Sequence, residues 1–222
     1  MKKIYLLGDS TCQTNGEDTY PQTGWGQILQ DYVTKEYKVI NLAKNGRSTK
    51  SFIDEGLFDP CKKKLKKGDI VIIQFGHNDE KEDVERHTDP FTSYQDNLNY
   101  FIDVALKKGA TPILISSIYR RQFIKEHKLV KNTHGLYPKA MKQVARKRKV
   151  IFIDMNKITY RWLKKLGDTK SKKYFMNFDT NIYPNYKEGK EDNTHLRYDG
   201  AKVICEFLIQ TIKKTKLKRI LK

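Results

Sequence analysis

The chain has 222 residues, of which 38% are hydrophobic and 32% are charged, and its formal net charge is +18 at pH 7. This length is typical of one domain, and the apolar fraction is large enough for a packed core. No apolar run approaches the ~18 residues of a membrane-spanning helix. We therefore expect a soluble globular protein that forms a single domain over residues 1–222.

The amino-terminal segment MKKIYLLGDS resembles a signal peptide only in its two lysines. Its apolar run has four residues, whereas the hydrophobic region of a signal peptide has ~7 to 15. We interpret this segment as a first β-strand and expect a cytoplasmic protein. The three cysteines are an odd number without metal-like spacing, which favours free thiols in a reducing compartment. We expect no metal and no cofactor.

Segments typical of strands and helices alternate along the chain. Short apolar, β-branched runs occur at residues 3–8, 37–43, 69–76, 111–118 and 149–155. Between them lie segments with helical spacing, such as the one that carries Tyr94, Leu98, Phe101, Ile102 and Ala105 and that Gly109 would end. This alternation predicts an α/β protein in three layers, with helices on both faces of a parallel sheet.

One long segment, from about Gly167 to Glu191, has no clear periodicity and is rich in polar and aromatic residues. Long irregular loops inside a compact domain are usually functional or disordered. We expect this segment to form a wall of the functional site.

The positive charge raises the alternative of a nucleic-acid-binding module. Many of the lysines, however, are spread over predicted helix faces, and such runs are more often solvated surfaces than binding sites. No zinc-finger, RNP-type or GXXG motif is present. Nucleic acid is therefore not the expected partner.

In parallel sheets, ligands bind beyond the carboxyl ends of the strands. Ser10 follows the first predicted strand, where it could merely cap a turn or act as a nucleophile activated by a base. His195 could be that base, since Asp192, three residues earlier, can accept its Nδ1 proton and leave Nε2 free. The competing interpretation is that Asp192 and His195 cap the helix predicted over residues 200–214. The other histidines, His87, His127 and His134, lie in polar surroundings without an obvious partner.

Acyl transfer also requires hydrogen-bond donors where negative charge develops on the carbonyl oxygen. Gly46 follows the second predicted strand and could present a backbone amide, and Asn78 follows the third and could present its side-chain amide. Gly46 could equally be a turn glycine, and Asn78 a strand-end cap.

Taken in order, these segments resemble the four blocks of the SGNH, or GDSL-type, hydrolases: Gly8-Asp9-Ser10, Gly46 in NGRS, Asn78 in GHND, and the pair Asp192 and His195. The resemblance implies a flavodoxin-like sheet of order 2-1-3-4-5. It also implies that Ser10 is the nucleophile, His195 the base and Asp192 its orienting carboxylate. The implied oxyanion hole consists of the Ser10 amide, the Gly46 amide and the Asn78 side chain.

The sequences GWGQ, NGRSTKSF and QFGHND are most similar to the rhamnogalacturonan acetylesterase branch. This resemblance implies removal of acetyl groups from acetylated pectic sugars, and thus a small carbohydrate substrate that is acidic if it contains galacturonate. The lack of a long apolar run predicts no membrane partner. A thioesterase or lysophospholipase that acts on a longer acyl chain is the alternative within the superfamily. A non-catalytic basic binding module is the remote one.

Several side chains near these motifs are candidate substrate contacts, although aromatic residues near a sheet edge are at least as often packing. The candidates are Trp25, Arg47, His77, Tyr174, Tyr183 and Tyr186. Arg47 could bind a galacturonate carboxylate through two hydrogen bonds, or it could brace its own loop. Cys12, close to Ser10, is expected to be a small buried side chain.

Overall fold

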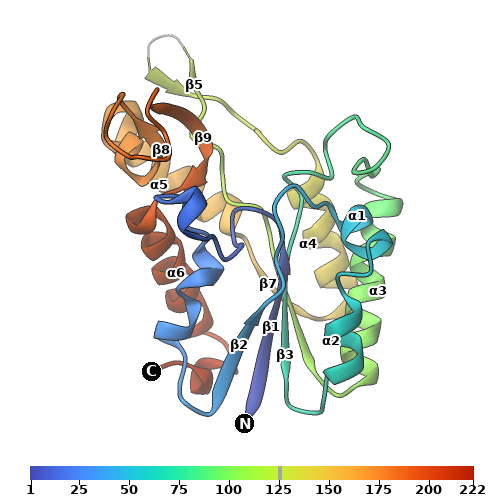
Figure 1. Cartoon of the computed structure of the whole chain (residues 1–222). Coiled ribbons are helices and arrows are strands. Elements are labelled where there is room, and N and C mark those ends of the chain that lie inside the picture. Colours follow the sequence, from blue (N-terminus) through green and yellow to red (C-terminus); the bar gives the residue numbers. More distant parts are fainter. Residues whose placement is uncertain (125–126) are drawn as a thin grey trace.

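A computed structural model describes residues 1–124 and 127–222 of the chain. Its centre is a five-stranded parallel sheet of order β2-β1-β3-β4-β7 (Figure 1). These strands are β1 (Lys2–Gly8), β2 (Tyr37–Asn41), β3 (Ile70–Gln74), β4 (Thr111–Ile115) and β7 (Ile151–Ile153). The five predicted strands and the flavodoxin-like order are confirmed.

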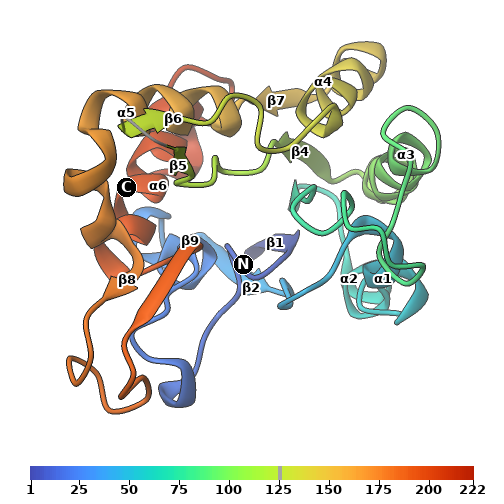
Figure 2. The same ribbon diagram turned by 90° about the horizontal axis from the view of Figure 1, so that it is seen from above.

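Helices cover both faces of the sheet, as Figures 1 and 2 show. One face carries α1 (Thr49–Asp54), α2 (Asp59–Lys64), α3 (Ser93–Lys107) and α4 (Tyr137–Arg148). The other carries α5 (Met155–Ser171), α6 (Tyr198–Ile212) and short 3-10 turns between residues 25 and 32. The predicted three-layer α/β architecture is confirmed.

Strand β1 shows why the sheet requires a layer on each side. Ile4 and Leu6 pack in the core beneath α5 and α6, whereas Tyr5 and Leu7 pack in the core beneath α1 to α4. Neighbouring side chains of a strand point to opposite faces, so a strand buried on both faces is a continuous apolar run. The segment from residue 4 to 7, Ile-Tyr-Leu-Leu, has this composition.

Two small antiparallel hairpins lie outside the main sheet: β5 (Phe123–Ile124) with β6 (Lys128–Leu129), and β8 (Phe175–Phe178) with β9 (Lys190–Leu196). The second corrects the prediction for Gly167 to Glu191. Helix α5 continues through a kink at Gly167, whose φ is 75°, and a 3-10 turn and β8 follow. Only residues 179–189 form the irregular connection between β8 and β9, which pair with each other. Two short strands of this kind produce no apolar periodicity that the sequence analysis could detect.

Among the described residues, no helix combines the length and the apolar character needed to cross a membrane. The strands that form the sheet are parallel, so their carboxyl ends lie along one edge. The segments that carry Ser10, Gly46 and Asn78 leave β1, β2 and β3 at that edge. The order of these strands makes the three segments neighbours.

Candidate active site

Ser10 lies in a tight turn directly after β1. The Asp9 carbonyl accepts a hydrogen bond from the Cys12 amide (3.2 Å), and the Asp9 carboxylate accepts one from the Thr11 amide (2.9 Å). Gly8 permits this turn, because a Cβ atom there would lie 2.4 Å from Cys12 Sγ and 2.8 Å from the Gln74 carbonyl oxygen. The turn presents the Ser10 hydroxyl toward His195.

His195 and Asp192 belong to an irregular stretch of β9. The Asp192 carboxylate accepts hydrogen bonds from the backbone amides of Thr194 (2.8 Å) and His195 (3.0 Å) and contacts His195 Nδ1 at 2.7 Å. His195 Nε2 lies 2.8 Å from Ser10 Oγ. An ionised carboxylate can only accept, so Nδ1 carries the imidazole proton and Nε2 can accept the proton of the serine hydroxyl.

The electrostatics of this pair favour an ionised Asp192. Burial by itself would raise the pKa of Asp192, but the hydrogen bond and charge of His195, together with two backbone amides, hold it well below its usual range. The carboxylate is therefore available to orient His195 and to stabilise its protonated form.

The Asp192 turn is braced by its neighbours in the fold. Asn177 on β8 donates to the Asp192 carbonyl (2.8 Å), and the Arg121 amide donates to the Asn193 carbonyl (2.8 Å). The Thr23 amide donates to the Leu196 carbonyl (2.9 Å). Helix α6 begins at Tyr198 with Arg197 as its N-cap, so Asp192 and His195 do not cap it. Their spacing serves the contact with Ser10.

The two other predicted oxyanion groups lie on the adjacent loops. Gly46 has a φ of 75°, so it is also the turn glycine that the alternative interpretation required. The backbone amides of Ser10 and Gly46 have no hydrogen-bond acceptor among the described residues. Asn78 Nδ2 donates to the Arg47 carbonyl (3.1 Å), which leaves its second amide hydrogen for another acceptor.

Two predicted substrate contacts are wrong, because their side chains are buried. Trp25 is 1% exposed, and its Nε1 donates to Gln74 Oε1 (2.7 Å) in the core. His77 is 3% exposed, and its Nδ1 lies 3.1 Å from the carboxylate of Asp9. His134, expected in polar surroundings, is buried with its ring edge-on to that of His77, 4.6 Å between centroids. Gln74, the partner of Trp25, and Asp9, the partner of His77, are distant in the sequence, so no local pattern indicated that these side chains are buried.

The Arg47 guanidinium is already occupied. Its Nε and one terminal nitrogen donate to the Glu55 carboxylate at 3.0 and 2.8 Å, and its other terminal nitrogen donates to the Asn45 carbonyl at 2.9 Å. The prediction that Arg47 binds a substrate carboxylate is therefore replaced by the alternative, in which it braces its loop. A nearby pocket of about 480 Å³ is lined by the acids Glu55, Asp83 and Glu85 and by the bases Arg47 and Arg86, so its charge does not favour an anion.

The three predicted tyrosine contacts lie around the β8–β9 hairpin. Tyr174 packs on Trp162, with 5.0 Å between ring centroids, and Tyr183 and Tyr186 both pack edge-on to Phe178. Tyr183 also lines a small pocket beside Arg197. Packing is thus the main role of Tyr174 and Tyr186.

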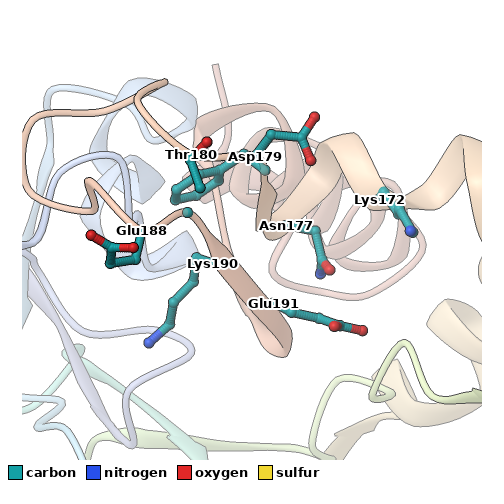
Figure 3. A pocket seen from close by; sticks show the side chains of 9 residues that line it. Lys172, Asn177, Asp179, Thr180, Glu188, Lys190 and Glu191 are labelled. Carbon is teal, nitrogen blue, oxygen red and sulfur yellow. The ribbon is translucent and has the colours of Figure 1, made fainter.

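The same hairpin carries a groove of about 810 Å³, and Glu191, the residue before Asp192, is part of its lining. Figure 3 shows the side chains of Lys190 and Glu191 extending from β9 in different directions, and that of Lys172 on the same side as Asn177. The groove is polar and carries charges of both signs. The segment predicted to be a wall of the site thus includes β8 and the first residues of β9, the strand that carries Asp192 and His195.

Cys12 is fully buried, and burial raises the pKa of its thiol well above the usual value. It remains a neutral thiol, which removes it as a second nucleophile. Asp9 received no role of its own in the sequence analysis, and the structure adds its bond to His77. The Gly-Asp-Ser run was the available signal, because it places a carboxylate directly before the serine.

Comparison with known proteins gives consistent matches. The GDSL-like Lipase/Acylhydrolase family matches residues 4–208. The chain is 38% identical over 215 residues to the rhamnogalacturonan acetylesterase RhgT of Bacillus subtilis (strain 168), covering 96% of this chain and 91% of RhgT. It is 36% identical to the probable rhamnogalacturonan acetylesterase YesY of the same organism, covering 95% of this chain and 92% of YesY.

A solved structure extends the comparison to the fold. The crystal structure of protein YxiM from Bacillus subtilis superposes with a TM-score of 0.80 at 24% identity. The match covers 96% of this chain, which spans 56% of the YxiM chain. With the family matched over most of its length and two full-length relatives above 30% identity, the chain belongs to the GDSL-like lipase/acylhydrolase family, an enzyme family of ester hydrolases.

Proposed function

We propose that this protein is a serine esterase that removes O-acetyl groups from pectic carbohydrate of the rhamnogalacturonan type. The observation that carries the chemistry is the chain of contacts from Asp192 through His195 to Ser10 Oγ, with 2.7 and 2.8 Å between the paired atoms. The similarity to RhgT and YesY over nearly the whole chain supports the substrate class.

In the first half of the proposed reaction, His195 Nε2 takes the proton of Ser10 as Oγ attacks the acetyl carbonyl carbon. The amides of Ser10 and Gly46 and the side chain of Asn78 donate to the oxygen that becomes negative. The bond between the acetyl carbon and the sugar oxygen then breaks, and the sugar oxygen receives the proton from His195. Acetyl-Ser10 remains.

In the second half, a water molecule gives its proton to His195 Nε2 and attacks the acetyl carbon of acetyl-Ser10. The bond to Ser10 Oγ breaks, Oγ recovers a proton from His195, and acetate leaves. Asp192 stays ionised throughout and holds the imidazole in the orientation that both halves require.

The polar surroundings of this site favour a short acyl group. The pocket beside Gly46 is lined by charged side chains, among them Arg47, Glu55 and Asp83. A long acyl chain requires an apolar lining, so the thioesterase or lysophospholipase alternative is disfavoured.

The test is release of acetate from acetylated rhamnogalacturonan oligosaccharides, with Ser10→Ala as the inactive control. Nitrophenyl esters of increasing chain length complete the comparison, and we expect kcat/KM to be highest for acetate. Efficiency that rises with chain length, without acetate release from the oligosaccharides, would establish the long-chain alternative instead. Labelling by a serine-directed phosphonate should locate to the Ser10 peptide.

A further inference from the structure

A second pocket, of about 260 Å³, lies where the segment after Ser10 meets the β8–β9 hairpin. Figure 2 shows the amino-terminal segment and this hairpin side by side. Backbone pairing between Gln22 and Arg197 fixes the contact. The residues that line the pocket are Tyr20, Pro21, Lys173, Tyr183, Arg197, Tyr198 and Asp199.

The pocket lies close to the proposed catalytic histidine. Arg197 follows His195 by two residues, and the chain between them is extended at the end of β9. Extended residues two apart point to the same side, with their Cα atoms about 7 Å apart. The pocket is therefore within reach of a substrate chain whose acetyl group lies at Ser10.

Arg197 is a cation without a carboxylate partner among the described residues. One terminal nitrogen donates to the Tyr183 hydroxyl at 3.3 Å, and the guanidinium carbon lies 5.9 Å from the centre of the Phe178 ring. These contacts hold the guanidinium in place without neutralising it. A positioned, unpaired guanidinium is suited to bind a carboxylate.

Lys173 adds a second positive charge to the same pocket. It lies over the Tyr174 ring, 5.2 Å from its centre, and no ion pair joins it to another described residue. Asp199 is the one acidic side chain in the lining, so the pocket has a positive balance. The pocket beside Gly46, by contrast, has three acidic side chains, Glu55, Asp83 and Glu85, against two arginines.

Two tyrosines give the pocket exposed aromatic surface. Tyr20 is 59% exposed and Tyr198 is 55% exposed, which is unusual for such large side chains. Aromatic faces combined with a few positioned polar groups are typical of small-molecule sites. Such faces can pack against the C–H faces of a sugar ring.

We propose that this pocket is a subsite for a uronate sugar of the substrate chain. Arg197 and Lys173 bind the uronate carboxylate, and Tyr20 and Tyr198 contact the sugar ring. The proposal rests on the function proposed above and adds to it the residues that recognise the uronate sugar.

The experiment compares three substrates: an acetylated oligosaccharide that contains galacturonate, an acetylated neutral oligosaccharide, and nitrophenyl acetate, which is too small to span both sites. The variants are Lys173→Gln, Tyr198→Ala and Arg197→Gln. Lys107→Gln, an exposed lysine at the end of α3, is the matched control for loss of charge. Tyr198 and Lys173 are exposed, so their variants keep the proposal testable if Arg197→Gln fails to fold.

We expect Arg197→Gln and Lys173→Gln to lower kcat/KM for the acidic substrate by about tenfold, mainly through KM. For nitrophenyl acetate, which does not reach this pocket, the loss of kcat/KM in the two variants should be smaller than for the acidic oligosaccharide. Tyr198→Ala should raise KM for both the acidic and the neutral oligosaccharide. Salt should lower kcat/KM for the acidic substrate in the wild type, because it screens the attraction between the two positive side chains and the carboxylate. The decrease should be smaller in the two charge variants, which lack one of these positive charges.

Equal loss for the acidic and neutral oligosaccharides in the charge variants, or no loss beyond that of Lys107→Gln, would overturn the uronate subsite while the wild type still released acetate. If the wild type hydrolyses nitrophenyl acetate but no acetylated oligosaccharide, the proposed function fails, and the subsite fails with it.

Discussion

The buried carboxylate of Asp9 accepts a hydrogen bond from Nδ1 of buried His77, with 3.1 Å between the two atoms. Asp9 directly precedes Ser10, and His77 directly precedes Asn78. The bond therefore joins the loop of the proposed nucleophile to the loop of a proposed oxyanion donor. Burial would raise the pKa of Asp9, but His77 and Thr11 lower it, so Asp9 remains ionised.

This bond makes His77 a positioning residue whose loss should impair turnover. We expect His77→Ala to lower kcat for nitrophenyl acetate by up to about 10²-fold, because a small displacement of a catalytic group is sufficient for such a loss. His77→Asn should retain more activity, since its amide nitrogen replaces Nδ1 as a donor. The measurement is kcat and KM together with the midpoint of urea unfolding. Equal activity of the two variants would show that the bond does not position the site.

Asn78→Ala tests the oxyanion donor. Its amide should stabilise the negative oxygen only as the tetrahedral intermediate forms, so the variant should lose about 10² to 10³ in kcat with little change in KM. The check is steady-state kinetics on nitrophenyl acetate. A variant of near-normal kcat would reduce Asn78 to its hydrogen bond with the Arg47 carbonyl.

Asp192→Asn tests the orientation of His195. The amide would present a donor where Nδ1 also donates, which favours the wrong tautomer, and we expect a loss in kcat on the order of 10³ to 10⁴. In the wild type, the low pKa of Asp192 keeps the carboxylate ionised through the whole range above pH 4. Activity should accordingly show no loss from Asp192 protonation in that range. Retention of more than a tenth of wild-type kcat would argue against the proposed role.

Asp79 gives a prediction about stability. It is fully buried, and burial raises its pKa from 3.8 to about 7, against the opposing hydrogen bonds of Thr49 and Thr88. The folded state therefore binds more protons than the unfolded state between about pH 4 and 7, and the free energy of unfolding falls as pH rises through this window. One such group contributes at most about 1.4 kcal/mol per pH unit.

The measurement is urea unfolding of the wild type and Asp79→Asn from pH 4 to 8. Subtracting the free energy of unfolding of Asp79→Asn from that of the wild type at each pH removes the contribution of the other titrating groups. We expect this difference to shrink as pH rises and to level off above pH 7. A difference that stays constant across this range would mean that Asp79 does not titrate there.

The sequence by itself determined the layers of this protein and the segments that form its site. The five apolar runs were sufficient to predict the sheet, because strands buried on both faces have a recognisable composition. Ser10, Gly46 and Asn78 could be predicted as site residues for the same reason, since each follows one of these runs. The cytoplasmic location stays a prediction.

Tertiary structure decided which of the nearby side chains face the solvent. Trp25 and His77 stand beside the motifs in the sequence, but Gln74 and Asp9 bind them in the interior. Glu55 likewise occupies Arg47. Arg197 was overlooked because its neighbours come from the segment near residue 20 and from β8, which only the fold brings together. Local patterns record burial and turns, whereas the partner of a polar side chain depends on contacts between distant parts of the chain.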